Sequence, residues 1–265
     1  MGIHPTAVVD PTAAIDPSAM IGPYVVVEGP VQIGPMCRIS ASAVILGNTI
    51  IEEGCQIHSH AVVGDVPQDN AYNGGVSYCH IGKRSTIREG ATVHRGTAEG
   101  STTVVGDDCL LMTNSHVGHN CRIGDGVVLV SGAVLGGYVD VGSRATISGN
   151  VGVHQFVRIG ELAMVSGLAK IVQDVPPFLM AGRDGAIVGV NRIGLIRAQF
   201  TSAERKDVKN AYRILYRSGH CRETALRQLA KDVTTDAGLR LLEFMLQDSS
   251  RGVARFARRE EHLET

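Results

Sequence analysis

The sequence predicts an all-β parallel β-helix followed by a small C-terminal α-helical domain. Three observations predict this architecture. An aliphatic residue recurs at every sixth position, a small residue follows it four positions later, and a helical periodicity replaces the repeat near the C-terminus. A chain of 265 residues is long enough for one solenoid with an appended domain. We expect the β-helix at residues 1–177 and the helical domain at residues 178–265.

The six-residue repeat is nearly continuous. Ile, Val or Leu occupies 26 of the 29 positions reached by steps of six from Ile3 to Ile171. This period fits short strands that each send one aliphatic side chain inward before the chain turns. Three hexads make one triangular coil of about 18 residues, and successive coils stack about 4.8 Å apart. We therefore expect positions 1 and 5 of each hexad to point inward and the others to point largely outward.

The repeat fails in two stretches, residues 66–80 and 97–104. Both stretches are rich in Gly, Asn, Ser or Thr, which is typical of loops that leave a regular scaffold. The three repeat positions without an aliphatic residue, Asp69, Gly75 and Glu99, fall within them. Because loops on a rigid scaffold commonly carry binding and catalytic residues, we expect function near these two.

The repeat ends at Pro176 and Pro177, and we expect four helices beyond it. Thr201 and Glu204 form a capping box that begins the first helix, and Gly219 ends it. The apolar residues that mark the other three helices are Ala225, Leu226 and Leu229; Leu239, Leu242, Met245 and Leu246; and Val253 and Phe256.

Composition excludes several classes of function. The formal net charge is −1, which gives no electrostatic basis for binding nucleic acid or a membrane surface. No apolar run is long enough to span a membrane, and the N-terminus lacks the features of a signal peptide. Five of the six cysteines fall at inward position 5, where they replace Ala or Val. We therefore expect neither disulfides nor a cysteine metal site, and a cytoplasmic setting.

The histidines show the opposite register. His94 and His154 fall at position 2, His119 at position 3 and His116 at position 6, so all four are expected to point outward, near the interrupting loops. A zinc site would be one use of such a cluster. The spacings of 22 and 3 residues between His94, His116 and His119 do not match the zinc-binding hexad proteins, although ligands from two subunits could still meet. We expect no metal.

Stacking places a base beside a backbone donor. Residues 18 apart lie in neighbouring coils, so His119, Gly137 and Gln155 form one column. A neutral imidazole can deprotonate a hydroxyl group, and a glycine N–H can stabilise the oxyanion of an acyl transfer. No Gly-x-Ser-x-Gly elbow is present, so a covalent serine intermediate is not expected.

Six motifs together resemble one family, and they cover nearly the whole chain. They are VHRGT (93–97), LLMTNSHVGHNC (110–121), VHQF (153–156), QDVPP (173–177), GVN (189–191) and NAYRILYRSG (210–219). The chain closely resembles the acyl-[acyl carrier protein]–UDP-N-acetylglucosamine O-acyltransferases, hexapeptide-repeat enzymes of the first step of lipid A biosynthesis. The resemblance implies a left-handed β-helix and a homotrimer with sites between subunits. It also implies acyl carrier protein as acyl donor, a UDP-sugar as acceptor, and no cofactor.

The resemblance also implies roles for individual residues. His119 would be the general base and Gly137 the oxyanion donor, while Gly167 would set the acyl-chain length and leave room for a longer chain. Asn191 and Arg197 would reach the nucleotide from a neighbouring subunit. The remaining substrate-contacting positions would be Gln68, Asp69, His94, His116, His154 and Gln155.

Four residues depart from the family pattern. Ala71 replaces a lysine, Asn120 an aspartate, Tyr138 a histidine and Ala198 an arginine. Loss of basic groups should weaken phosphate binding, which leaves two alternatives open. One is N-acylation of a variant amino-sugar nucleotide, and the other is a catalytically reduced paralogue that only binds acyl carrier protein or nucleotide. The candidates for attracting the acidic carrier protein are Arg197, Arg240, Arg251, Arg258 and Arg259, with simple solvation of these arginines as the alternative.

Overall fold

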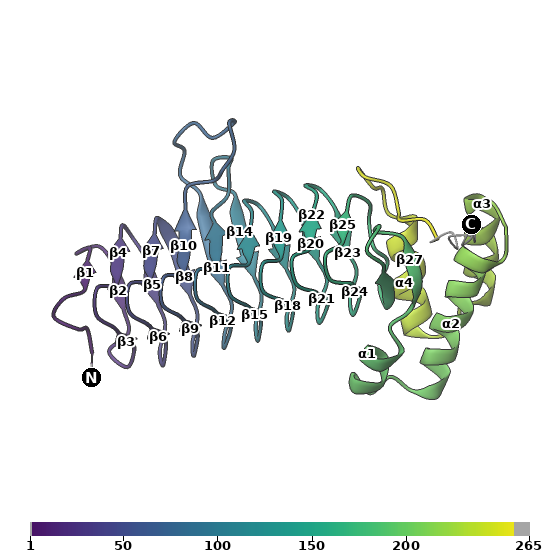
Figure 1. The fold of residues 1–265 in the computed structure, drawn as a ribbon, viewed down its shortest axis with the longest axis horizontal. Helices are drawn as coiled ribbons and strands as arrows, with labels where there is room; N and C mark the ends of the chain where they lie inside the picture. The colour runs from purple at the N-terminus through teal and green to yellow at the C-terminus, as the bar shows by residue number, and fades with distance from the viewer. Residues whose placement is uncertain (1, 257–265) are drawn as a thin grey trace, which may run out of the picture.

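The structure, a computed structural model, describes residues 2–256. It has the predicted fold, a left-handed parallel β-helix with a small helical region at its C-terminal end. Figure 1 shows the coils stacked along the long axis of the molecule, with the helices beside the last coils. No helix among the described residues is long and apolar enough to cross a membrane.

Three sheets form the walls of the prism, and from β4 to β25 each strand pairs in parallel with the strand three places earlier, while β26 pairs with β24. The first wall contains β1 (Val8–Val9), β4 (Val26–Glu28), β7 (Val44–Leu46), β10 (Val62–Asp65), β13 (Thr92–His94), β16 (His116–Val117), β19 (Val134–Leu135), β22 (Gly152–Val153) and β25 (Lys170–Ile171). The second contains β2 (Ala14–Ile15), β5 (Gln32–Ile33), β8 (Asn48–Ile51), β11 (Tyr78–Ile81), β14 (Thr102–Val105), β17 (Arg122–Ile123), β20 (Asp140–Val141) and β23 (Arg158–Ile159). The third contains β3 (Met20–Ile21), β6 (Arg38–Ile39), β9 (Gln56–Ile57), β12 (Thr86–Ile87), β15 (Leu110–Leu111), β18 (Val128–Leu129), β21 (Thr146–Ile147), β24 (Met164–Val165), β26 (Leu179–Ala181) and β27 (Ile187–Val190). Parallel pairing continues through β26, and β27 adds the only antiparallel pair among these strands.

The core follows the hexad register. Aliphatic side chains at position 1 and small ones at position 5 fill the prism, and most are almost completely buried. Five cysteines lie in the interior as free thiols, while Cys221 is exposed. Burial raises the pKa of both the Cys79 and the Cys121 thiol to about 12, so neither is a nucleophile at neutral pH.

Two loops leave the prism where the repeat fails, as Figure 1 shows above β10, β11 and β14. They span residues 66–77 and 95–101, because β11 and β14 take up the last residues of each interrupted stretch. The loops contact each other: the Val76 N–H donates to the Glu99 carboxylate at 2.9 Å. Arg95 donates to the Tyr72 hydroxyl at 3.1 Å and to the Gly64 carbonyl at 3.0 Å. The first loop is thereby held against the first wall.

The helical region contains α1 (Arg192–Arg197), α2 (Ser202–Arg217), α3 (Arg222–Asp232) and α4 (Asp236–Leu246). The predicted capping box at Thr201 and Glu204 is present and begins α2. The short α1 was not predicted, because it buries only Leu195 and so has no amphipathic pattern. The predicted fourth helix at Val253 and Phe256 is wrong. Both residues are extended and form single bridges, to Asp174 and Ile187, where free strand edges offer backbone partners.

A charged cluster joins the helices to the last coils. Asp174 is fully buried and accepts from the Arg158 backbone N–H and Nε, both at 2.8 Å. Arg158 also donates to Gln247 at 2.7 Å and lies over the Phe244 ring of α4. The Asp174 carboxylate holds the Arg158 guanidinium, and Arg158 contacts Gln247 and Phe244, so this cluster fixes the helical region relative to the β-helix.

Candidate active site

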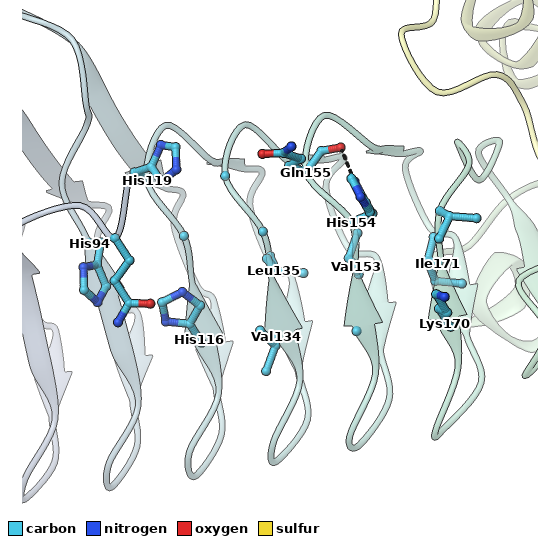
Figure 2. Close-up of a pocket in the computed structure, with 16 residues that line it drawn as sticks. His94, His116, His119, Val134, Leu135, Val153, His154, Gln155, Lys170 and Ile171 are labelled. Atoms are coloured by element: carbon cyan, nitrogen blue, oxygen red, sulfur yellow. Dashed lines mark hydrogen bonds between the residues drawn. The ribbon is translucent and has the colours of Figure 1, made fainter. Parts of the chain in front are cut away.

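A cavity of about 540 Å³ lies along the first wall, between β16 and β25. Seven of the predicted site residues line it, and Figure 2 shows how most of them lie: Gln68, His94, His116, His119, Gly137, His154 and Gln155. The strand register explains the arrangement. His116 pairs with Val134, Val134 with Gly152 and Gly152 with Lys170, so these four residues form one outward column.

Two of the histidines are buried although they point out of the prism. His94 and His119 are only 6% and 8% exposed. The cause is the first loop, whose Val66 carbonyl bonds His94 Nδ1 and whose Asp69 lies beside His119. Their predicted outward direction is therefore correct, but the loop covers them. His154, which no loop covers, is exposed.

His119 is held on both sides of its ring. Its Nδ1 lies 2.8 Å from Thr97 Oγ1 and 3.1 Å from Asn120 Oδ1, and its Nε2 lies 3.7 Å from Asp69 Oδ2. Tyr138 contacts the ring edge-on, with centroids 5.3 Å apart. A buried imidazole with fixed neighbours can accept a proton at a defined place in the cavity.

Gly137 lies directly beside the His119 ring, as the 18-residue column predicts. The Tyr138 N–H donates to the His119 carbonyl at 2.9 Å, which joins the two coils. A Cβ atom at Gly137 would lie 2.4 Å from both His119 Nε2 and Cε1, so no other residue fits without moving the imidazole. Among the described residues the Gly137 N–H has no hydrogen-bond acceptor, and the residue lines the cavity. A backbone N–H without an acceptor and an imidazole ring therefore belong to neighbouring residues that line one cavity.

Asp69 is a carboxylate at neutral pH. The Ala71 backbone N–H, which donates to it at 3.0 Å, holds its pKa below the usual range, and the Thr97 hydroxyl and His119 act in the same direction. The departure at Ala71 therefore leaves this interaction intact, because it uses the backbone and not the side chain.

His116 is neutral at neutral pH. Burial lowers its pKa to about 4, and the nearby His94 and His119 contribute in the same direction. Its Nδ1 lies 2.7 Å from Thr92 Oγ1, and its ring contacts His94 edge-on at 5.2 Å. Such a group can position a polar substrate through hydrogen bonds, but it does not supply a positive charge.

Four predicted residues do not line this cavity: Asp69, which lies beside His119, and three that lie farther away. Gly167 follows β24 on the third wall, where an added Cβ would meet only ordinary contacts at 3.6 Å or more. Asn191 caps α1 by accepting from the Gly194 N–H at 2.9 Å, and it donates to the Leu162 carbonyl at 2.8 Å. Arg197 is exposed at the end of α1. Within one chain these three residues do not meet His119.

Two residues of the site were missed. Thr97 begins the second interrupted stretch and was not singled out, whereas its hydroxyl contacts His119. Lys170 lines the far end of the cavity, as Figure 2 shows. It lies three coils beyond His116 in the same column, so the 18-residue spacing could have identified it. Within residues 2–256, no group of three His, Cys, Asp or Glu side chains is arranged to hold a metal ion.

Comparisons with known proteins identify the family of the chain. The family profile described as Udp N-acetylglucosamine O-acyltransferase, Domain 2, matches residues 174–254, the bacterial transferase hexapeptide profile matches 102–137, and a GMPPB C-terminal domain profile matches 3–95. The acyl-[acyl-carrier-protein]–UDP-N-acetylglucosamine O-acyltransferase of Anaeromyxobacter sp. (strain Fw109-5) is 42% identical over 96% of this chain and 100% of its own length.

Solved structures give the same result. The UDP-N-acetylglucosamine acyltransferase of Francisella novicida superposes with a TM-score of 0.92 at 37% identity, over 96% of this chain and 94% of that one. The UDP-N-acetylglucosamine O-acyltransferase of Moraxella catarrhalis RH4 gives 0.92 at 38% identity, over 96% and 100%. On sequence and structure alike, this chain belongs to the acyl-[acyl-carrier-protein]–UDP-N-acetylglucosamine O-acyltransferase family.

Proposed function

We propose that this protein transfers a 3-hydroxyacyl chain from acyl carrier protein to the glucosamine 3-hydroxyl of UDP-N-acetylglucosamine, the first step of lipid A biosynthesis. The observation that carries the proposal is the contact of His119 with Gly137, where a base and an unpaired backbone donor face one cavity. Family membership supports the same reaction, because the Anaeromyxobacter relative has this name.

The mechanism uses groups of the chain alone. His119 takes the proton of the 3-hydroxyl as that oxygen attacks the thioester carbonyl carbon. The Gly137 N–H donates to the oxyanion of the tetrahedral intermediate, a contact of the kind that contributes about 10²–10³-fold to a rate. The C–S bond then breaks, and the imidazolium returns its proton to the pantetheine sulfur. The products are the 3-O-acyl sugar nucleotide and the free thiol of the carrier protein.

The acyl and nucleotide ends of the substrate need further surfaces. The cavity is open beside the first wall, whereas Gly167, Asn191 and Arg197 lie elsewhere on the chain. A homotrimer would bring the third wall and α1 of one subunit to the cavity of the next, and it would give these three residues their predicted roles. Mixed trimers of His119→Ala and Arg197→Ala subunits test this arrangement, since some clefts would regain both residues and activity would return.

The basic surface of α2 is a better site for acyl carrier protein than the predicted arginines. Arg240 is paired with Glu161 and Asp236, Arg251 donates to the Val172 carbonyl, and Arg258 and Arg259 lie outside the described residues. A second cavity, beside α1 and α2, is lined by five cationic residues that form no ion pair within 4 Å with any carboxylate of residues 2–256. They are Arg192, Arg205, Lys206, Lys209 and Arg213. An acidic carrier protein fits this surface.

The deciding experiment is an acyl-transfer assay with a length series of 3-hydroxyacyl carrier proteins. UDP-N-acetylglucosamine and its 3-amino analogue serve as the two acceptors. We expect ester formation with the hydroxyl acceptor, and a fall in kcat of about 10²–10⁴-fold in His119→Ala with the fold unchanged. Preference for the amino acceptor would establish the N-acylating alternative. Binding of both ligands without turnover at any chain length would establish a binding paralogue.

A further inference from the structure

We propose that Asn120 and Thr97 fix His119 in the tautomer that carries its hydrogen on Nδ1, so that Nε2 is the base. Thr97 is then a positioning residue of the reaction. The tautomer follows from geometry alone, whereas its consequence for catalysis rests on the proposed function.

The side-chain amide of Asn120 has only one possible orientation. The Thr97 backbone N–H lies 2.9 Å from the Asn120 side chain and can only donate. The atom of Asn120 that faces it must therefore be the oxygen and not the amide nitrogen. The same oxygen lies 3.1 Å from His119 Nδ1. Because this oxygen carries no hydrogen, the hydrogen of the pair must belong to Nδ1.

The Thr97 hydroxyl supports the same assignment. Its oxygen lies 2.8 Å from His119 Nδ1, and Thr97 is only 5% exposed. A hydroxyl has one hydrogen and two lone pairs, so it can accept from Nδ1–H and donate elsewhere. The Asp69 carboxylate, which only accepts, is the neighbour to which this hydroxyl can donate, since the hydroxyl contributes to lowering the pKa of Asp69. The three side chains then form a chain that runs from the carboxylate through the hydroxyl to the imidazole.

Asp69 Oδ2 lies 3.7 Å from Nε2, beyond hydrogen-bond distance, so Nε2 keeps a free lone pair next to Gly137. Asn120 and Thr97 together take the place of the aspartate that usually follows the base in this family. An amide and a hydroxyl select the tautomer as a carboxylate would, but they stabilise the imidazolium less. The titratable groups that face His119 are Asp69, His116 and Tyr138. Among these, Asp69 is a carboxylate at neutral pH and His116 is neutral.

The first test needs no substrate. Long-range ¹H–¹⁵N correlation spectra of the full-length protein, labelled with ¹⁵N in histidine, distinguish the two tautomers. A His119→Gln variant assigns the signal. We expect His119 to be protonated at Nδ1 in the free protein. Protonation at Nε2 would overturn the proposal, whether or not the protein has acyltransferase activity.

The second test separates positioning from binding. Thr97→Val removes the hydroxyl but keeps the backbone N–H that bonds Asn120, so we expect kcat to fall about three- to tenfold with both KM values unchanged. Thr97→Ser should restore kcat. Asn120→Asp places a carboxylate beside Nδ1, which favours the protonated ring, and the acid limb of kcat/KM should move up by about one pH unit.

Several results would contradict this inference. An unchanged kcat in Thr97→Val, or an acid limb in Asn120→Asp that matches the wild type, would each overturn it. Wild-type protein without any transfer would refute the proposed function instead, and the spectra would still decide the tautomer. Circular dichroism and thermal midpoints of each variant exclude unfolding as the cause of a lost rate.

Discussion

A methyl group at Gly137 would occupy the space of the His119 imidazole. The added Cβ would lie 2.4 Å from Nε2 and Cε1, whereas ordinary contact begins at 3.4 Å, so the ring must move by about 1 Å. The contacts of His119 with Thr97 and Asn120 oppose this movement. Alanine keeps the backbone N–H, so the proposed oxyanion donor is still present. A displacement of about 1 Å at a reacting group can lower a rate about 10²-fold, which is the fall in kcat that we expect for Gly137→Ala.

The assay is acyl transfer at saturating concentrations of both substrates. Gly152→Ala is the matched control, because it lies in the same wall and cavity but an added Cβ meets nothing within 4 Å. We expect its kcat to stay within about threefold of the wild type, since no catalytic group moves. A kcat for Gly137→Ala within the same threefold range would refute the reasoning, because it would show that the base need not occupy its present position.

Three further predictions concern stability and partner binding. The pKa of His116 is about 4 in the folded protein and 6.5 ordinarily, so between these pH values only the unfolded chain binds a proton at this residue. We therefore expect this residue to lower the free energy of unfolding by about 3 kcal/mol from pH 7 to pH 4. Urea unfolding of His116→Gln should lack this contribution. Asp174→Ala leaves Arg158 without its buried partner and should lower the free energy of unfolding by about 3–5 kcal/mol, with Asp174→Asn losing less. Charge reversal at Lys206 and Lys209 should raise KM for acyl carrier protein but not for the sugar nucleotide, and high salt should abolish the difference between variant and wild type.

The regular part of the molecule could be predicted from the sequence because its geometry repeats. Six-residue spacing assigns each side chain to the interior or the exterior, and 18-residue spacing assigns its neighbour in the next coil. The contact between His119 and Gly137 is therefore a consequence of register, and the structure confirms it. The capping box at Thr201 was equally predictable, since it depends on two residues three positions apart.

Features that depend on irregular backbone could not be predicted. No periodic rule says that loop 66–77 folds back over His94 and His119, and so their burial was missed. The extended conformation of Val253 depends on a free edge at Asp174, 79 residues earlier in the chain. Local apolar spacing instead favoured a helix there. In both cases the two residues in contact are distant in sequence and are not related by the 18-residue spacing of the coils.

The contrast between His119 and His154 shows what the loops add to the solenoid. Both side chains point out of the prism and line the same cavity, yet His119 is 8% exposed and His154 is exposed. The hexad register therefore places a histidine at the cavity but does not fix the orientation of its ring. The interruptions supply the rest: Asp69 comes from the first loop and Thr97 from the second. Because the two loops also bond each other through Glu99, a change that loosens either one should disturb the same imidazole. The coils thus place the proposed base beside the proposed oxyanion donor, and Asn120 of the coil acts with Thr97 and Asp69 of the loops to fix the direction of that base.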